Sequence, residues 1–334
     1  MLGMLLAAEW SRRFAHEGGE PCSRTLMLLF LLFALFQAYL HHVYVDIQFY
    51  MSAPFSNDVW QYHHHREVLK LSPEVLPHSY RVLPFGIIAV GEWFTGSFFY
   101  AKTLLRVSCY YFSFLAAYCA ATVYYPPRTA FVAVFILVML YPISIAYYAG
   151  QPTDTVSHLA FFLAFCFLAL RRFPEFALTV LVGLFAKETI LVMAPCWFFC
   201  TIEKRLYVRL AQSVSLAAVG VVILLLIRLS VTGGDLSYSK ISGIDLSHIL
   251  TNLLNPLWPG QLLFQVGVLL PFWWRMRQST PKDVQTLLLV LLPIITVSSL
   301  MFSWLHEARN FVPCSFLLAL TAAACFCNKT EPVR

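Results

Sequence analysis

Long apolar runs separated by short charged connections constrain this sequence more than any other feature. A helix rises 1.5 Å per residue, so about 20 apolar residues cross the ~30 Å hydrocarbon core of a bilayer. The sequence therefore predicts an all-α, polytopic transmembrane bundle of about ten helices (9–11), forming a single membrane domain over residues 1–334. The expected spans lie near residues 25–45, 83–100, 103–124, 129–148, 153–170, 174–200, 207–228, 258–274, 284–303 and 309–327.

The scarcity of charge supports this class. Only 12% of the 334 residues are charged and 59% are apolar, whereas a soluble domain carries roughly 25% charged residues. The net charge of +6 does not indicate a nucleic-acid partner, because the basic residues sit mostly in short connections, as the positive-inside rule predicts for cytoplasmic loops. The nine cysteines include no CxxC pair and lie mostly in apolar runs, so we expect neither a zinc site nor a cofactor.

The charged connections also predict an orientation. Arg12, Arg13 and Arg24 place the N-terminus in the cytoplasm, and the connections 46–82, 229–257 and 304–310 then lie outside. In a simple count of spans, Arg171 and Arg172 fall outside as well, against the rule. In a second topology, 174–200 is a broken hairpin and 83–100 does not fully cross. Both topologies keep the three outer connections outside.

The first outer connection, 46–82, is the longest polar stretch. Ser56 can cap a helix that Ser72 and Pro73 terminate, and we expect this helix to be amphipathic and to lie on the outer leaflet. Asp58 stands near its start, where a carboxylate can accept a proton from an incoming hydroxyl. The alternative is that Asp58 only interacts with the positive end of the helix dipole.

Ionisable residues also interrupt or end the later apolar runs. His306, Glu307 and Arg309 lie between the last two spans, and Arg can bind a phosphate through two parallel hydrogen bonds. A local ion pair at a helix end is the alternative. Lys187 and Glu188 occur inside GLFAKETILVMAP, and adjacent charges in such a run must face a protein interior or a water-filled cavity.

Two further basic groups are candidates for ligand contact. Arg81, in SYRVLPF, is an isolated charge at a span end, which snorkelling toward water would also explain. The run His63 to His65 does not predict a metal site, because consecutive helical residues point in different directions. One of these rings, for which we take His64, can contact a phosphate or a sugar.

This layout resembles the GT-C superfamily of polytopic glycosyltransferases, whose long first outer loop carries a catalytic acid. Asp58 occupies the corresponding place, and HEARNFVP is similar to the HKExRF-type motif of mannosyltransferases in this superfamily. The segments YAGQPTDTVSHLAFFLAF and GLFAKETILVMAP are similar to stretches in bacterial members. Asn57-Asp58 supplies one carboxylate where many members have a pair, and the motif lacks its Lys.

The resemblance implies a membrane hexosyltransferase that moves a mannose-like sugar from a polyprenyl-phosphate donor to a hydroxyl of a glycan, lipid or protein. Asp58 would be the general base, the configuration would invert, and neither metal nor cofactor would be needed. The site would face the periplasm at a bacterial plasma membrane. Substrate and phosphate binding would involve Arg81, Lys187, Glu188, His306, Glu307, Arg309 and His64. The alternative class is a polytopic transporter or lipid flippase, although no internal repeat is visible.

Overall fold

The computed structural model describes residues 24–43, 57–76, 78–145, 152–232 and 246–327, without the side chains of Arg24 and residues 57–60. Within these ranges every regular element is a helix and no strand occurs. The elements are α2 (Arg24–His41), α4 (Asn57–Leu69), η2 (Pro73–Val75), η3 (His78–Tyr80), α5 (Val82–Thr95), α6 (Phe98–Thr122), α7 (Pro127–Ile145), α8 (Thr153–Ala169), α9 (Phe173–Gly183), η4 (Glu188–Val192), α10 (Met193–Cys200), α11 (Leu206–Thr232), α12 (Leu246–Leu254), α13 (Leu257–Gln265), η5 (Gly267–Leu269), α14 (Leu270–Met276), α15 (Lys282–Phe302), η6 (Ala308–Phe311) and α16 (Val312–Phe326).

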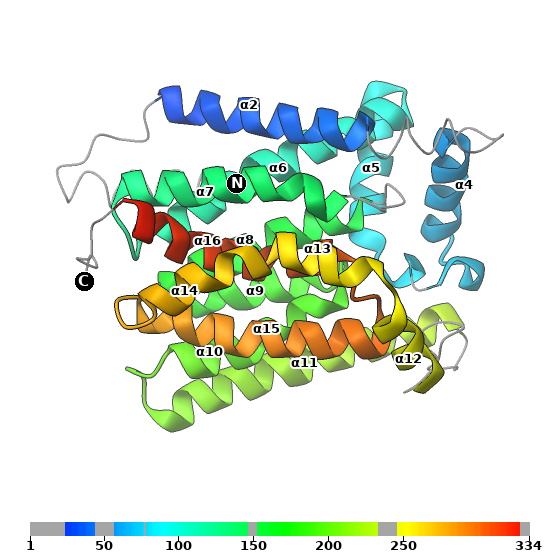
Figure 1. Ribbon diagram of the computed structural model, residues 1–334. Helices are drawn as coiled ribbons and strands as arrows, with labels where there is room; N and C mark the ends of the chain where they lie inside the picture. Colours follow the sequence, from blue (N-terminus) through cyan, green and yellow to red (C-terminus); the bar gives the residue numbers. More distant parts are fainter. Residues whose placement is uncertain (1–23, 44–56, 77, 146–151, 233–245, 328–334) are drawn as a thin grey trace.

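Most of these helices run roughly side by side as a bundle, and α4, α5 and α12 lie at one of its ends (Figure 1). We call this the α5 end. Five helices are long and apolar enough to cross a membrane, namely α6, α7, α11, α15 and the run from η6 through α16. A sixth crossing results if α12 and α13–α14, which meet at a bend of 72°, form one broken span. The chain is a multi-pass α-helical membrane protein, so the predicted all-α transmembrane class is confirmed.

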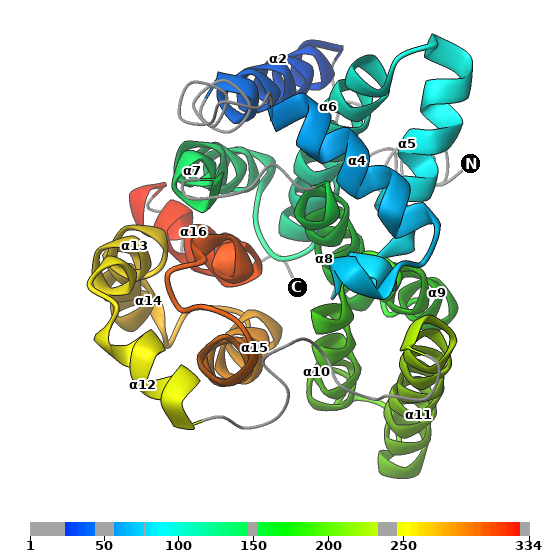
Figure 2. The same cartoon turned by 90° about the vertical axis from the view of Figure 1, so that its right-hand side faces the viewer.

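The apolar run 83–100 does not form one span. α5 ends at Thr95, Gly96 adopts a left-handed conformation with φ of 68°, and the Ser97 side chain caps the start of α6. Glycine reaches positive φ at no steric cost because it has no Cβ. α5 consequently runs across the end of the bundle, while α6 runs along it (Figures 1 and 2). This arrangement corresponds to the second predicted topology.

The run 174–200 is likewise broken. α9 ends at Gly183, a turn follows, and η4 with α10 continues the chain; the Phe185 carbonyl in this turn accepts a hydrogen bond of 3.0 Å from Leu83 N of α5. At the opposite end of α9, Arg171 lies 2.8 Å from Glu203 and 2.7 Å from Asp283. Arg171 therefore shares an end of the bundle with the connections around 203 and 283, and its conflict with the positive-inside rule disappears.

The first outer connection differs in part from the prediction. α4 begins at Asn57, as expected, but the side of the helix that is buried carries Gln61, His64, His65 and Val68. These residues pack toward α5 and η3. The described part of α4 thus directs Val68 into the protein instead of the outer leaflet, and Leu69 is partly buried. The expected contribution of Val59 and Trp60 and the Ser56 cap lie outside the described residues.

The core is built around α8. Nearly every side chain of α8 is buried, because α6 and α9 pack closely on it and α10 and α16 also contact it. A helix that is apolar all round requires such complete burial. Its ionisable residues, Asp154 and His158, consequently have to find partners inside the protein at the α5 end.

Candidate functional site

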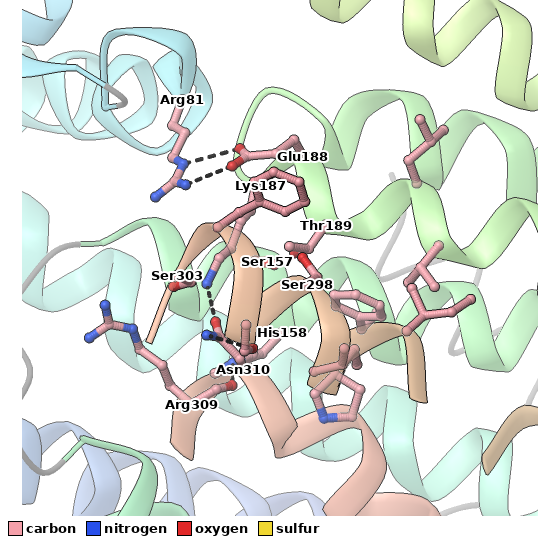
Figure 3. A pocket seen from close by; sticks show the side chains of 18 of the residues that line it. Arg81, Ser157, His158, Lys187, Glu188, Thr189, Ser298, Ser303, Arg309 and Asn310 are labelled. Atoms are coloured by element: carbon pink, nitrogen blue, oxygen red, sulfur yellow. Dashed lines mark hydrogen bonds and ion pairs between the residues drawn. The ribbon is translucent and has the colours of Figure 1, made fainter. Parts of the chain in front are cut away.

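A cavity of about 540 Å³ lies between the helices at the α5 end (Figure 3). Its wall combines Arg81 from the start of α5 with residues of α8, η4, α10, α11, α15, η6 and α16. Four cationic side chains contribute to the lining: Arg81, Lys187, Arg228 and Arg309. Segments more than 200 residues apart in the chain thus meet around one space.

Arg81 and Glu188 form one charged group of the wall. The Arg81 guanidinium donates from Nε to Glu188 Oε2 at 3.2 Å and from Nη2 to Oε1 at 2.8 Å, so the pair is bidentate. Side-chain exposures of 11% and 17% remove most competition from water. The backbone bond from Leu83 to Phe185 holds the same two segments together. The pair therefore fixes the hairpin turn against α5.

Lys187 belongs to a second charged group. Its Nζ lies 2.6 Å from Asp154 Oδ1 and 2.7 Å from Asn310 Oδ1. Arg309 approaches the other oxygen of Asp154, with Nε 3.1 Å from Oδ2. Buried charges are stable only when they are paired and hydrogen-bonded, and this arrangement meets that condition for all three. Asp154 is thereby the central anion of the site.

Glu307 supports Arg309 from the side that does not line the cavity. Its Oε1 accepts a bond of 2.7 Å from Arg309 Nη2, and its Oε2 accepts one of 2.8 Å from Ser303 Oγ. The Arg309 backbone is also held, because its carbonyl lies 2.9 Å from His158 Nε2, while His158 Nδ1 lies 2.9 Å from Tyr141 Oη. The Arg309 guanidinium therefore has a fixed orientation, and its positive charge is balanced by neighbouring carboxylates.

Two of the predicted binding residues lie elsewhere. His306 does not line the cavity; its Nδ1 lies 3.1 Å from Asn255 Nδ2, and burial lowers its pKa below the ordinary value. His64 lies on the buried side of α4, with its ring 5.0 Å from that of His78 and 5.9 Å from that of Phe85. Burial, and then the neighbouring His63, lower the pKa of His64. Neither ring is positioned to contact a ligand in the cavity.

Asp58, the predicted general base, lies in the first turn of α4 at the α5 end (Figure 1). Its side chain lies outside the part of the chain that is described. The structure consequently places the backbone of Asp58 at the same end of the bundle as the cavity and leaves its catalytic role a prediction.

The wall also has an apolar part and a row of hydroxyls. α15 contributes Ser298, Ser299 and Ser303, and hydroxyls of Ser157 and Thr189 lie on the facing elements. The cavity is also bounded by apolar side chains: Phe161, Leu191, Val192, Pro195, Ile294, Ile295, Phe302 and Pro313. Such a wall fits a molecule that combines an anionic group, a hydroxyl-rich part and a hydrocarbon part.

Sequence reasoning missed several of these residues as members of the site. Asp154 occurs in the segment YAGQPTDTVSHLAFFLAF, but it was not predicted as a site residue, and neither were Arg228 and Asn310. An ionisable residue inside an apolar run was the available signal for Arg228, which ends the run 207–228. Among the described residues, no group of three or more His, Cys, Asp or Glu side chains could hold a metal ion.

Comparisons with protein-family models, with curated proteins and with solved structures found no match. The fold and the site define a multi-pass membrane protein with an ion-paired, partly apolar cavity at one end of its bundle. Its function has to be argued from this cavity.

Proposed function

We propose that this chain is a glycosyltransferase of the GT-C type, with about ten membrane-crossing segments, that uses a polyprenyl-phosphate sugar as donor. One observation carries the proposal: the wall of a single cavity is divided between four cationic side chains and several aliphatic or aromatic ones. A lipid-linked sugar phosphate has the same division, with an anion and hydroxyls at one end and hydrocarbon at the other.

In this proposal the four cationic side chains of the cavity face the donor phosphate, namely Arg81, Lys187, Arg228 and Arg309. The acceptor hydroxyl attacks the anomeric carbon, the bond from that carbon to the phosphate oxygen breaks, and the electron pair leaves with the phosphate. The acceptor proton passes to Asp58, and the configuration inverts. Fixed cations stabilise the charge that develops on the leaving phosphate, and general-base help is worth roughly 10²–10⁴ in rate.

The hydroxyl row of α15 would face the sugar, and the apolar wall would hold the first isoprene units of the tail. Glu188 and Glu307 would hold Arg81 and Arg309 in place without contacting the sugar. The acceptor is a hydroxyl of a glycan, a lipid or a protein, and the site faces the outer side, which we take to be the periplasm of a bacterial plasma membrane.

The proposal is tested first by binding. Undecaprenyl phosphate, added to the purified protein, is followed by native mass spectrometry; we expect binding that Arg309→Gln and Arg228→Gln weaken at least tenfold. Arg275→Gln is the matched control, because Arg275 is exposed on α14, outside the cavity lining. Equal binding by all variants would contradict the phosphate role of the cavity.

Catalysis is tested separately in proteoliposomes with labelled polyprenyl-phosphate mannose and glucose and a membrane lipid extract as acceptor. We expect a covalent glycosylated product whose rate of formation falls by about 10² or more in Asp58→Asn. Full activity of that variant would remove Asp58 from the mechanism.

A second candidate function is a transporter or lipid flippase. Interrupted helices favour it: the α9–η4 break carries Lys187, which lines the cavity, and elsewhere α12 meets α13 at a sharp bend. Broken helices of this kind form the binding sites of many transporters. Movement of the labelled lipid across the proteoliposome membrane without a covalent product would support this function over transfer.

A further inference from the structure

Helix α12 has three chemically distinct sides. Successive helical residues are about 100° apart, so residues four apart share a side. One side carries His248 and Asn252, which are 7% and 0% exposed. A second side carries Ser247 and Thr251, both exposed. The third side carries exposed leucines: Leu246, Leu250, Leu253 and Leu254, at 69%, 49%, 46% and 80%.

The buried polar side holds the connection between α15 and η6. Asn252 Nδ2 donates to the carbonyls of Ser299 and Ser303 at 3.0 Å, and Asn252 Oδ1 accepts from Leu305 N at 2.8 Å. His248 Nε2 lies 2.8 Å from the Ser303 carbonyl. These contacts hold the C-terminal end of α15 against α12, where the Ser299 carbonyl also accepts a bond of 3.2 Å from Ser303 N. The side of α12 that carries His248 and Asn252 therefore faces protein, whereas the polar side of a helix on a water-soluble domain usually faces water.

The leucine side continues into a surface that faces lipid. α12 meets α13–α14 at the 72° bend, and α13 carries exposed apolar side chains, Leu263 and Phe264 among them. Tryptophans mark both ends of α13–α14: Trp258 donates its indole N–H to the Leu253 carbonyl at 3.0 Å, and Trp274 is 63% exposed. Their separation in sequence corresponds to about 24 Å of helix, close to the hydrocarbon thickness, and tryptophan favours the two membrane interfaces.

From this placement we propose that α12 is an interfacial helix seated in the leaflet at the α5 end. Its leucines lie among the acyl chains, Ser247 and Thr251 face the headgroups and water, and Asn252 holds the α15–η6 connection. Trp258 sets the interface depth, and α12 comes just before it in the chain. The lipid leaflet is thus the partner that positions the connection bearing Arg309, whichever reaction the cavity performs.

The leucine side of α12 favours lipid over a second copy of the chain or water as its neighbour. A second copy of the chain would also bury leucines, but it would not explain the continuity with α13 or the tryptophan at the bend. Water is unsuited to a side composed of four leucines on a nine-residue helix.

The test is photo-crosslinking of the full chain in phosphatidylcholine vesicles. p-Benzoylphenylalanine replaces Leu250, Leu254 or, as the matched control on the same helix, Thr251. Irradiation followed by mass spectrometry should give a phosphatidylcholine adduct at positions 250 and 254 and at least fivefold less at 251. Leu254 is the most exposed of the leucines, so its replacement preserves folding even if that of Leu250 does not.

Three results would overturn the proposal. A crosslinked dimer at positions 250 and 254 would assign the leucine side to a second copy. The absence of a lipid adduct there would place it in water. Equal lipid adducts at 250, 254 and 251 would show that α12 has no defined orientation in the interface.

Discussion

Replacement of Asp154 tests the charge balance of the cavity most directly. Asp154→Asn keeps the shape of the side chain and removes the anion that lies 2.6 Å from Lys187 and 3.1 Å from Arg309. Arg309 retains Glu307, whereas the other hydrogen-bond partner of Lys187 is the neutral Asn310. The loss of stability therefore comes mainly from Lys187, which keeps no anionic partner and whose side chain is only 10% exposed.

Removal of one partner from a buried ion pair costs about 3–5 kcal/mol, and one uncompensated cation argues for the lower end, near 3 kcal/mol. Because 1.4 kcal/mol is a factor of ten, the unfolding equilibrium constant should rise roughly 10²-fold. The measurement is reversible denaturation of the purified protein in mixed detergent micelles, followed by tryptophan fluorescence.

The double variant Asp154→Asn/Lys187→Met separates charge from packing. Once both charges are absent, no uncompensated cation remains, and most of the lost stability should return. Glu67→Gln is a control, because Glu67 pairs with Lys70 on the surface of α4 and its loss should leave the midpoint unchanged. Wild-type stability of Asp154→Asn, or no recovery in the double variant, would refute the reasoning.

Three further perturbations have defined outcomes. A Cβ at Gly220 would lie 2.5 Å from Leu191 Cδ1 in the cavity wall, so Gly220→Ala should cost about 1–3 kcal/mol in the same denaturation assay. Asn252→Ala removes the contacts that end α15 and should cost about 2 kcal/mol or more, measured in the same way. Burial, and then Arg81, hold the pKa of His78 well below its ordinary value of 6.5, so the fold favours the neutral ring. The stability that His78 contributes is full above pH 6.5 and is lost as the pH falls below it; proteolysis of the α4–α5 segment should therefore accelerate at pH 5.5 in the wild type but much less in His78→Gln.

The sequence predicted the class of fold because the length of an apolar run can be read from consecutive residues alone. It could not decide between two topologies for 83–100 and 174–200, since average hydropathy does not reveal a break. The breaks depend on single residues: the left-handed Gly96 with the Ser97 cap, and the turn before Lys187. The sequence predicted a lipid-facing helix in the first outer connection, whereas the helix with a separate leucine side is α12. The reason that α12 also has a buried polar side is visible only in the structure, where this side packs against α15.

The charged members of the cavity were partly predictable. A charge in an apolar run must find a partner inside the protein, which is why Arg81, Lys187, Glu188 and Arg309 were singled out. The identity of each partner was not predictable, because Lys187 pairs across 33 residues with Asp154 and bonds across 123 with Asn310. His64 and His306, which were predicted to contact substrate, do not line this cavity, because the sequence alone does not fix the direction of a side chain.

The break in the run 174–200 has a consequence for biogenesis. α9 has 11 residues, or about 16 Å of helix, which is half of a bilayer, and the chain then presents Lys187 at mid-segment. A central lysine costs roughly 2.5–3.5 kcal/mol to insert, so we expect a translocon to accept such a segment less readily when it is alone. Asp154 precedes Lys187 in the chain, so α8 is synthesised first and can offer its carboxylate while the hairpin leaves the ribosome. Integration of residues 173–200 is thus a cooperative event that depends on a helix already in the bilayer.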